Sequence, residues 1–186
     1  LYGGTFDPIH NGHLRVIVEL VSRKVVDQII LIPAGEPQLR NVGPSADPQS
    51  RLQMCKLAVA DLPPDVKKSI EVSDIEILRK GPSYTIDTVE SLLKMRAGMD
   101  LHELFWIIGS DAYEKIDSWH RANELKDLVS FIVIDRPGSA DAGELDGMDI
   151  GALDISATKI RSDKSVSGVS PSVRKYILER KLYASK

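Results

Sequence analysis

The sequence predicts an α/β protein: a Rossmann-like, doubly wound parallel sheet with helices on both faces and a small helical extension at the C-terminal end. Two observations carry this prediction. Short apolar runs alternate with segments of helical spacing, as in parallel sheets whose strands are buried on both faces. Glycine or polar residues follow the runs, at positions 3–4, 34–35, 109–111 and 136–138. We therefore expect one ligand crevice at the carboxyl ends of the strands.

After a first strand that ends at Gly3 and Gly4, the chain is expected to form the following elements: a helix over residues 14–26, a strand over 27–35, a helix over 48–62, a strand over 69–77, a helix over 85–98, a strand over 104–111, helices over 112–120 and 121–129, a strand over 130–138, a loop over 139–154, and helices over 156–163 and 171–183. All 186 residues are expected to belong to one domain, in which residues 156–186 form a C-terminal helical part.

The strands are predicted from composition. Continuous apolar runs with β-branched residues stand in DQIILIPAG (27–35), LFWIIGSD (104–111) and SFIVIDRPG (130–138). The run SIEVSDIEI (69–77) alternates between apolar and polar residues, which is typical of a half-buried strand. A buried strand usually has about five residues, and only two residues precede the first glycine. We therefore expect that strand residues precede Leu1.

Residues that start or end helices give the helix boundaries. Asp47 and Pro48 are typical of an N-cap and a first helical position, and Pro171 has the same place in the last helix. The helix from residue 48 stops before Pro63, and Gly98 would end the helix that starts at residue 85. Cys55 lies in the apolar helical pattern of residues 51–60, where we expect it to pack in the core.

Composition excludes several classes of protein. The formal net charge of −3 and the pI near 5.8 argue against nucleic-acid binding. No apolar run reaches the length of a membrane span, and no signal-peptide pattern is seen, so we expect a cytoplasmic protein without a membrane partner. A single cysteine excludes a disulfide framework. The sequence does not decide between a monomer and a homo-oligomer.

The opening stretch LYGGTFDPIHNGHL contains the residues best suited to bind phosphate. Gly3 and Gly4 would let a ligand approach the backbone, and the chain then enters a helix whose free N–H groups favour an anion. His10 and His13 could donate to phosphate oxygens, with Gly12 keeping the space between the rings clear. A helical zinc pair prefers a spacing of four residues, whereas these histidines are three apart, so no protein metal site is predicted.

Two motifs at opposite ends of the chain resemble those of the nucleotidyltransferase superfamily. GGTFDPIHNGHL is similar to its H-x-G-H signature, and ISATKIR (155–161) is similar to its I-S-x-T-x-x-R motif. Between them, the features most similar to one family of that superfamily, the bacterial nicotinate-mononucleotide adenylyltransferases, are LIPAGEP, SYTIDT (83–88), IIGSD (107–111), Trp119-His120, DRPG (135–138) and a terminal YIxxxxLY. The resemblance covers essentially the whole chain.

The resemblance implies adenylyl transfer from ATP, carried with Mg²⁺, to nicotinate mononucleotide, giving deamido-NAD and pyrophosphate in NAD biosynthesis. The mononucleotide phosphate would attack the α-phosphorus directly, without a general base or a covalent intermediate. The residues then expected to be catalytic are His13, which would stabilise the α-phosphate, His10 and Arg161. The residues expected to bind ATP are Gly3, Gly4, Thr5, Phe6, His10, Gly12, His13, Gly109, Asp111, Ile155, Ser156, Thr158 and Arg161.

Three of these residues have an alternative role. Ser156 could be an ordinary N-cap, and Arg161 a surface ion-pair residue. Asp111 could bind a ribose hydroxyl or cap the helix that follows it.

The residues expected to bind the mononucleotide are Tyr84, Thr85, Trp119, Arg136 and Arg40. Trp119 would stack on the nicotinate ring, with core packing as its alternative role, whereas Trp106 is expected in the core. Backbone N–H groups at Tyr84 and Thr85 would receive the nicotinate carboxylate. In place of the Pro-Pro-His-Lys-like segment of many relatives the chain reads Pro-Gln-Leu-Arg at 37–40. Leu39 cannot donate a hydrogen bond, and Arg40 carries the charge with a different geometry.

Other activities stay open at this point. Within the superfamily they are transfer to nicotinamide mononucleotide, alone or with dual specificity, transfer to phosphopantetheine, and cytidylyl transfer. From another class, the same fold could serve as a non-catalytic nucleotide-binding sensor. The intact set of histidine, hydroxyl and arginine residues in the two motifs argues against the sensor.

Overall fold

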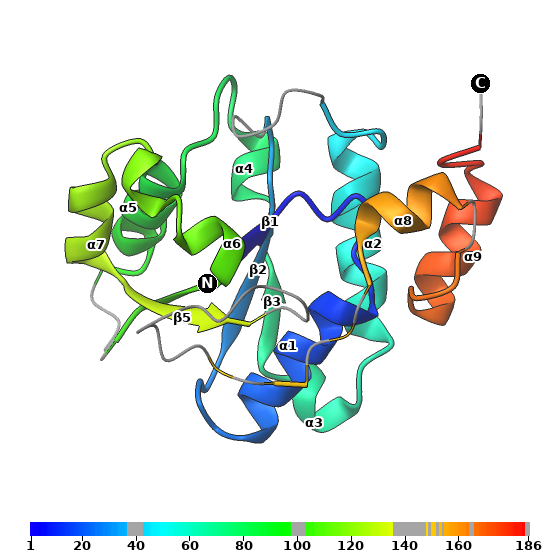
Figure 1. Ribbon diagram of the computed structural model, residues 1–186, viewed down its shortest axis with the longest axis horizontal. Coiled ribbons are helices and arrows are strands. Elements are labelled where there is room, and N and C mark those ends of the chain that lie inside the picture. The colour runs from blue at the N-terminus through cyan, green and yellow to red at the C-terminus, as the bar shows by residue number, and fades with distance from the viewer. Residues whose placement is uncertain are drawn as a thin grey trace.

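The computed structural model describes residues 1–36, 43–97, 103–135, 148, 150–151, 153, 155–163 and 166–184. Its centre is a five-stranded parallel sheet with the strand order β3-β2-β1-β4-β5 (Figure 1). The strands are β1 (Tyr2–Gly4), β2 (Ile29–Pro33), β3 (Ile70–Val72), β4 (Phe105–Gly109) and β5 (Ser130–Ile134). The predicted doubly wound α/β fold is confirmed.

The strand order places a switch point beside β1. The chain winds outward from β1 through β2 to β3, then returns to the other side of β1 for β4 and β5. Tyr2 pairs with Leu31 of β2 on one side and with Ile107 of β4 on the other. Connections that leave a parallel sheet in opposite directions open a crevice at the carboxyl ends of those strands. The segments after β1 and β4 therefore lie where a ligand is expected.

Helices cover both faces of the sheet, and each face has its own core. On one face lie α1 (Asn11–Ser22), α2 (Pro48–Ala60), α3 (Pro64–Lys67), α8 (Ala157–Ser162) and α9 (Pro171–Glu179). On the other lie α5 (Thr85–Met95), the 3₁₀-helix η1 (Ile116–Ser118) and α7 (Ala122–Leu128). Figure 1 shows α5 and α7 on one side of the strands and α1, α2 and α9 on the other. The short helices α4 (Ile75–Leu78) and α6 (Ser110–Tyr113) follow β3 and β4.

The apolar runs form strands because both of their faces are covered. In β2, Leu31 faces the first core, while Ile30 and Ile32 face the second. Cys55 and Trp106 are buried, in the first and second core respectively, as the sequence predicted. In the described part of the chain, no helix is both long and apolar enough to cross a membrane.

The structure corrects several predicted boundaries. The strand expected over residues 69–77 ends at Val72, and its second half forms α4, because four alternating residues cannot distinguish one helical turn from a strand. The helix expected over 112–120 is instead α6, which begins at Ser110, followed by η1. The helix expected over 14–26 begins at Asn11 and ends at Ser22, and the helix expected over 171–183 ends at Glu179.

Other expected elements keep their type but are shorter than predicted. Asp47 caps α2 as predicted, with its carboxylate accepting from the Ser50 backbone N–H at 2.9 Å. The helix α5 ends at Met95, and the expected stop at Gly98 lies outside the described residues. Most of the loop expected over residues 139–154 also lies outside them.

Candidate active site

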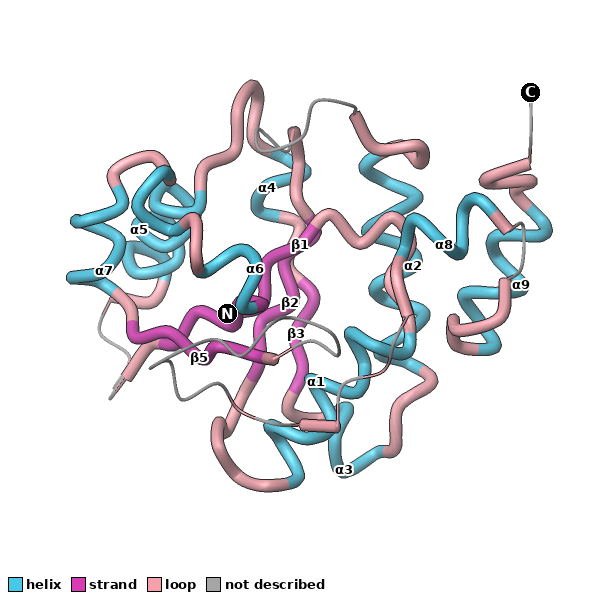
Figure 2. Tube along the Cα trace, in the orientation of Figure 1, coloured by secondary structure: helices cyan, strands magenta, loops and turns pink. Residues whose placement is uncertain are grey.

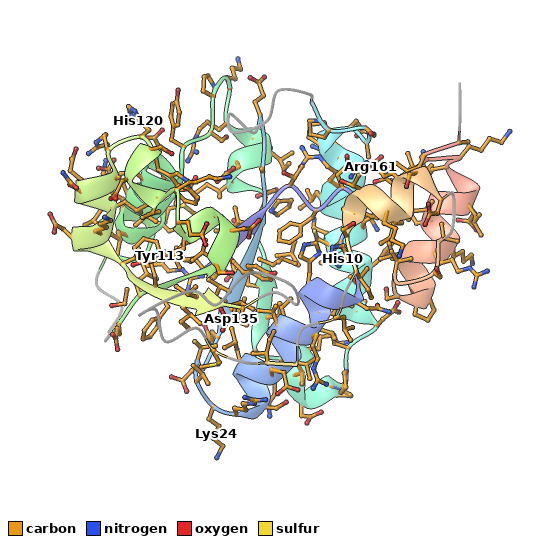
Figure 3. The ribbon with its side chains drawn as sticks, in the orientation of Figure 1. His10, Lys24, Tyr113, His120, Asp135 and Arg161 are labelled. Carbon is orange, nitrogen blue, oxygen red and sulfur yellow. The ribbon has the colours of Figure 1, made fainter. Side chains whose placement is uncertain are left out.

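The two motifs from opposite ends of the chain meet beyond the carboxyl end of β1. The guanidinium of Arg161, on α8, donates from Nη1 to the backbone carbonyl of Asp7 at 2.6 Å. The backbone N–H of Asn11 donates to the Gly168 carbonyl at 2.7 Å. Figure 2 shows the loop that leaves β1 running toward α8 and α2, and Figure 3 shows His10 and Arg161 on the same side of the sheet. The site is therefore assembled from segments about 150 residues apart.

The two predicted histidines form a stacked pair at the start of α1. Their ring centroids lie 3.7 Å apart with 26° between the planes. His10 is the N-cap residue, and its backbone N–H donates to Nδ1 of His13 at 3.2 Å. Because Nδ1 of His13 accepts this hydrogen bond, the proton of its neutral ring is on Nε2. His13 thus presents an N–H donor on the side of the ring away from the helix cap.

Gly12 lies against this pair. A Cβ atom at Gly12 would be 3.0 Å from both Cε1 and Nδ1 of His10, and 3.7 Å from the carbonyl oxygen of Ile155. Contacts of 3.0 Å are closer than packed side chains adopt. The side chain of any other residue at position 12 would thus press on the His10 ring. The clear space that was expected between the two rings is not present, because the rings are stacked on each other.

Glycine is required at positions 3 and 4 of β1 for a different reason from the one predicted. A Cβ at Gly3 would lie 2.5 Å from Cζ2 of Trp106, and a Cβ at Gly4 would lie 2.9 Å from Cζ of Phe6. The space that we expected a ligand to use is filled by these two aromatic rings. Phe6 is itself buried, with a left-handed φ of 48°, and its ring meets His13 edge-on at 5.0 Å. Contacts of Gly3, Gly4 and Phe6 with ATP stay predictions, with only their backbone available for them.

Asp7 is a buried residue to which the sequence analysis gave no role. Its side chain is 2% exposed, and its carboxylate accepts hydrogen bonds from the Ser45 N–H at 2.7 Å, the Ala46 N–H at 3.1 Å and the Tyr183 hydroxyl at 2.8 Å. Its Oδ2 lies 3.8 Å from Nη1 of Arg161. Asp7 therefore connects the first motif with the loop before α2, with the second motif and with the segment after α9. The feature of the sequence that could have indicated a role for Asp7 is its position in TFDP, between the glycines and the histidines.

Arg51 is a second residue that sequence reasoning missed. Its guanidinium is fully buried under the site and donates to the carbonyls of Thr5, at 2.8 Å, and Gly35, at 3.0 Å. Burial lowers the pKa of Arg51, and the negative charge of Asp7 opposes this shift. The side chain ties the segment after β1 to the segment after β2. A signal was present in the sequence, because Arg51 lies one helical turn before Cys55, which was expected to pack in the core, and both are buried in α2.

The hydroxyl residues of the second motif lie at the start of α8. Ser156 is the N-cap, and its Oγ accepts from the Lys159 backbone N–H at 3.2 Å, so the capping alternative describes its contact in this structure. Oγ1 of Thr158 accepts from Nη2 of Arg161 at 3.2 Å. Both side chains are exposed, and both hydroxyls keep their own proton for donation. Arg161 is bonded to the first motif and is not the surface ion pair that was the alternative for it.

At the end of β4, Gly109 is the N-cap of α6 and Asp111 is the second residue of that helix. The alternative in which Asp111 caps the helix is therefore wrong, because the cap position is two residues earlier. Asp111 is exposed at the carboxyl end of a strand next to β1. Its expected contact with a ribose hydroxyl stays a prediction.

Three of the five residues predicted for the mononucleotide, Tyr84, Thr85 and Trp119, belong to the other face of the sheet. Tyr84 is the N-cap of α5, so Thr85 is its first residue, and Trp119 follows η1. Tyr84 and Trp119 both pack against the second core, and the Tyr84 ring lies 4.4 Å from that of His120, with 33° between the planes (His120 is labelled in Figure 3). Sequence analysis gave His120 no role, although it adjoins Trp119. Arg40 and Arg136 lie outside the described residues.

The described residues offer no preformed cage for a metal ion. Nowhere among them do three or more His, Cys, Asp or Glu side chains gather as metal ligands would. A divalent ion that arrives with ATP would have to keep mostly phosphate and water ligands at such a site.

Comparison with known proteins identifies the family of the chain. The family model described as cytidylyltransferase-like matches residues 1–163. The chain is 38% identical over 192 residues to nicotinate-nucleotide adenylyltransferase from Bacillus subtilis (strain 168), covering 100% of this chain and 97% of that one.

Two solved structures of the Plasmodium falciparum nicotinic acid mononucleotide adenylyltransferase have the same fold at 19% identity. The complex with NaAD has a TM-score of 0.77 and the complex with APC one of 0.72; each covers 98% of this chain, and the matches extend over 95% and 94% of the respective chains. From the family model and the identity over the whole chain, together with the two motifs that meet beyond β1, the chain belongs to the cytidylyltransferase-like family and, within it, to the nicotinate-nucleotide adenylyltransferases.

Proposed function

We propose that this protein transfers the adenylyl group of ATP to nicotinate mononucleotide, with release of pyrophosphate, as a step of NAD biosynthesis. The observation that carries the proposal is the meeting of the two motifs. It brings a stacked histidine pair, two exposed hydroxyls and an arginine to one end of the central strand. These are hydrogen-bond donors and positive charge of the kind that a triphosphate requires. The names of the relatives support the choice of acceptor.

The reaction requires the protein to position the two substrates and to stabilise negative charge on the phosphates. A phosphomonoester has a second pKa near ~6, so the mononucleotide phosphate is largely a dianion at neutral pH and attacks without a general base. Its oxygen forms a bond to the α-phosphorus while the bond to the bridging oxygen of pyrophosphate breaks. Negative charge then grows on the α-phosphate oxygens and on the leaving group.

His13 and the residues of the second motif then have defined parts. The Nε2–H of His13 would donate to an α-phosphate oxygen, since its Nδ1 is held by the His10 N–H. Arg161, with Ser156 and Thr158, would bind the β- and γ-phosphates and stabilise the pyrophosphate as it leaves. Mg²⁺ would enter as part of the substrate MgATP, held by phosphate oxygens and water.

The acceptor would bind on the side of α5 and η1. The nicotinate ring would stack on Trp119, and its carboxylate would receive hydrogen bonds from the first backbone N–H groups of α5, at Tyr84 and Thr85. An amide in place of the carboxylate would lose the charge that these donors favour. We therefore expect a preference for the acid.

The test is a pyrophosphate-release assay with MgATP, and in parallel with MgCTP, on a panel of acceptors: nicotinate mononucleotide, nicotinamide mononucleotide and phosphopantetheine. We expect turnover with nicotinate mononucleotide and a kcat/KM at least about tenfold lower with the amide, since one charge-assisted contact is lost. Equal kcat/KM values for acid and amide would overturn the acceptor assignment. Binding of ATP without turnover on any acceptor would favour the sensor, and activity only with CTP would favour cytidylyl transfer.

A further inference from the structure

The segment after α9 carries a side chain that reaches back into the first motif. Tyr183 donates from its hydroxyl to Oδ1 of Asp7 at 2.8 Å, across 176 positions of sequence. Asp7 in turn holds Arg161 through its backbone carbonyl, at 2.6 Å, with its carboxylate 3.8 Å from the guanidinium. A chain of three residues thus leads from the C-terminal segment to the arginine expected to bind the leaving group.

We propose that Tyr183 is a positioning residue for adenylyl transfer: its hydrogen bond to the buried Asp7 carboxylate holds Asp7, and through it Arg161, in the geometry that binds the β- and γ-phosphates. The proposal rests on the function proposed above. Tyr183 itself touches neither Arg161 nor the histidine pair by any hydrogen bond among the described residues.

The backbone conformation around it supports a functional role for the Asp7–Tyr183 hydrogen bond. Tyr183 has a φ of 61°, in the left-handed region that a bulky residue rarely adopts. Phe6, which immediately precedes Asp7, has a φ of 48°. Residues keep such conformations only where their surroundings hold them, and they are common at functional sites. Tyr183 and the residue that precedes Asp7 therefore both have unusual backbone conformations.

Electrostatics make the Tyr183 hydroxyl the donor, and the Asp7 carboxylate the acceptor, of this hydrogen bond. Burial raises the pKa of the Tyr183 hydroxyl, and the negative charge of Asp7 raises it further. The hydroxyl therefore stays protonated near neutral pH and acts as a donor to the carboxylate. Asp7 receives further hydrogen bonds from the Ser45 and Ala46 N–H groups. These donors satisfy the Asp7 carboxylate, whose Oδ2 lies 3.8 Å from Nη1 of Arg161. The guanidinium therefore keeps donors for phosphate instead of forming a short ion pair with Asp7.

Removal of the hydroxyl should change this balance. In Tyr183→Phe the ring still packs against the first core, but Oδ1 of Asp7 loses one of its donors. The carboxylate is then freer to draw in Arg161, and the segment that carries the Asp7 carbonyl is less well held. Both effects move Arg161 away from the phosphates and leave the mononucleotide half of the site unchanged.

The experiment measures steady-state kinetics of Tyr183→Phe with nicotinate mononucleotide and MgATP varied separately. We expect kcat/KM for MgATP to fall about tenfold, the effect of losing one hydrogen bond to a charged group, and KM for the mononucleotide to stay within about twofold. Tyr176→Phe is the matched control. Tyr176 lies in α9, and its hydroxyl donates to Ser50 Oγ at 3.4 Å, away from Asp7. Its removal should leave kcat/KM for MgATP and KM for the mononucleotide unchanged.

A double-mutant cycle separates positioning from general stability. If Tyr183 acts through Arg161, Tyr183→Phe should have almost no further effect on kcat/KM for MgATP in the Arg161→Ala background. Equal effects in both backgrounds, or no ATP-selective defect in Tyr183→Phe, would overturn the proposal while the wild-type activity stands. Absence of turnover in the wild-type protein would instead contradict the proposed function. General destabilisation would reduce activity in both backgrounds alike, so it is distinguished from positioning.

Discussion

Single residues of this site serve packing and chemistry at once. His13 contacts the His10 ring by stacking and the Phe6 ring edge-on, and its Nδ1 accepts a backbone hydrogen bond. These contacts fix the ring, and with Nδ1 as an acceptor the N–H donor of the neutral ring is Nε2. The orientation is set before a substrate arrives, as a group that stabilises transition-state charge requires.

His13→Ala should therefore lower kcat by about 10²–10³-fold, because a donor to the charge growing on the α-phosphate is lost. Affinity for a non-hydrolysable ATP analogue, measured by calorimetry, should change by less than about fivefold, because Arg161 and the hydroxyls remain. Near-normal turnover in His13→Ala would remove this side chain from the proposed mechanism.

Close packing in the segment after β2 leaves no space for a side chain at Gly35. A Cβ at this position would overlap the backbone carbonyl oxygen of Glu76, in α4, and lie 2.9 Å from its carbon. Gly35→Ala should lower the free energy of unfolding by about 2–3 kcal/mol, because a backbone neighbour cannot rotate away. Gly43→Ala is the matched control, since no atom lies within 4 Å of its Cβ position. Equal urea midpoints for both variants would contradict the packing argument.

At the scale of elements, helix starts carry the site. His10 caps α1, Ser156 caps α8, Tyr84 occupies the cap position of α5, and Asp47 caps α2. The cap of α2 matters because this helix carries Arg51, which ties together the segments after β1 and β2. Local capping chemistry therefore contributes to the geometry of the ligand crevice.

Asp47→Ala should lower the free energy of unfolding by about 1 kcal/mol at pH 7, through loss of the N-cap. Hydrogen bonds from Ser50 lower the pKa of Asp47 in the folded protein. A carboxyl whose folded pKa is below its unfolded value of ~3.9 stabilises the fold above that value and loses the contribution as the pH falls through the folded pKa. The difference from wild type should therefore shrink below about pH 4.

Asp47→Asn is the control for this titration, because asparagine keeps the cap without a charge. Its stability relative to wild type should be nearly constant at neutral pH and improve as the pH falls below about 4. Urea unfolding between pH 3 and 7 measures both variants. A wild-type to Asp47→Ala difference that is independent of pH would mean that the carboxylate charge does not act at this cap.

At the scale of the whole molecule, the two halves of the proposed site use different faces of the sheet. The phosphate residues are supported by the first core through α1, α8 and α9, whereas Tyr84 and Trp119 pack against the second. We expect one ligand crevice to join them at the carboxyl ends of the central strands. We therefore expect ATP binding and mononucleotide binding to be separable by mutation.

Trp119→Ala should raise KM for nicotinate mononucleotide by about 3- to 10-fold, through loss of ring stacking, and leave the increase in Tm caused by MgATP unchanged. Arg161→Ala should do the reverse, reducing the MgATP-dependent increase in Tm while KM for the mononucleotide stays within about twofold. Steady-state kinetics and thermal unfolding with and without MgATP test both variants. Loss of the MgATP effect in Trp119→Ala would show that the halves are not independent.

The sequence by itself determined the parallel α/β fold, the strands of the sheet, the cap of α2 and the membership of the family, because these depend on local composition and on contiguous motifs. Only the tertiary structure decided what lies around those motifs. It filled the space at Gly3 and Gly4 with Trp106 and Phe6, buried Arg51 beneath the site, and joined Asp7 to Tyr183. Such contacts join residues from different elements, some of them more than 100 positions apart. Periodicity and capping rules describe neighbours along the chain, so only the folded arrangement of the sheet and its helices reveals these partners.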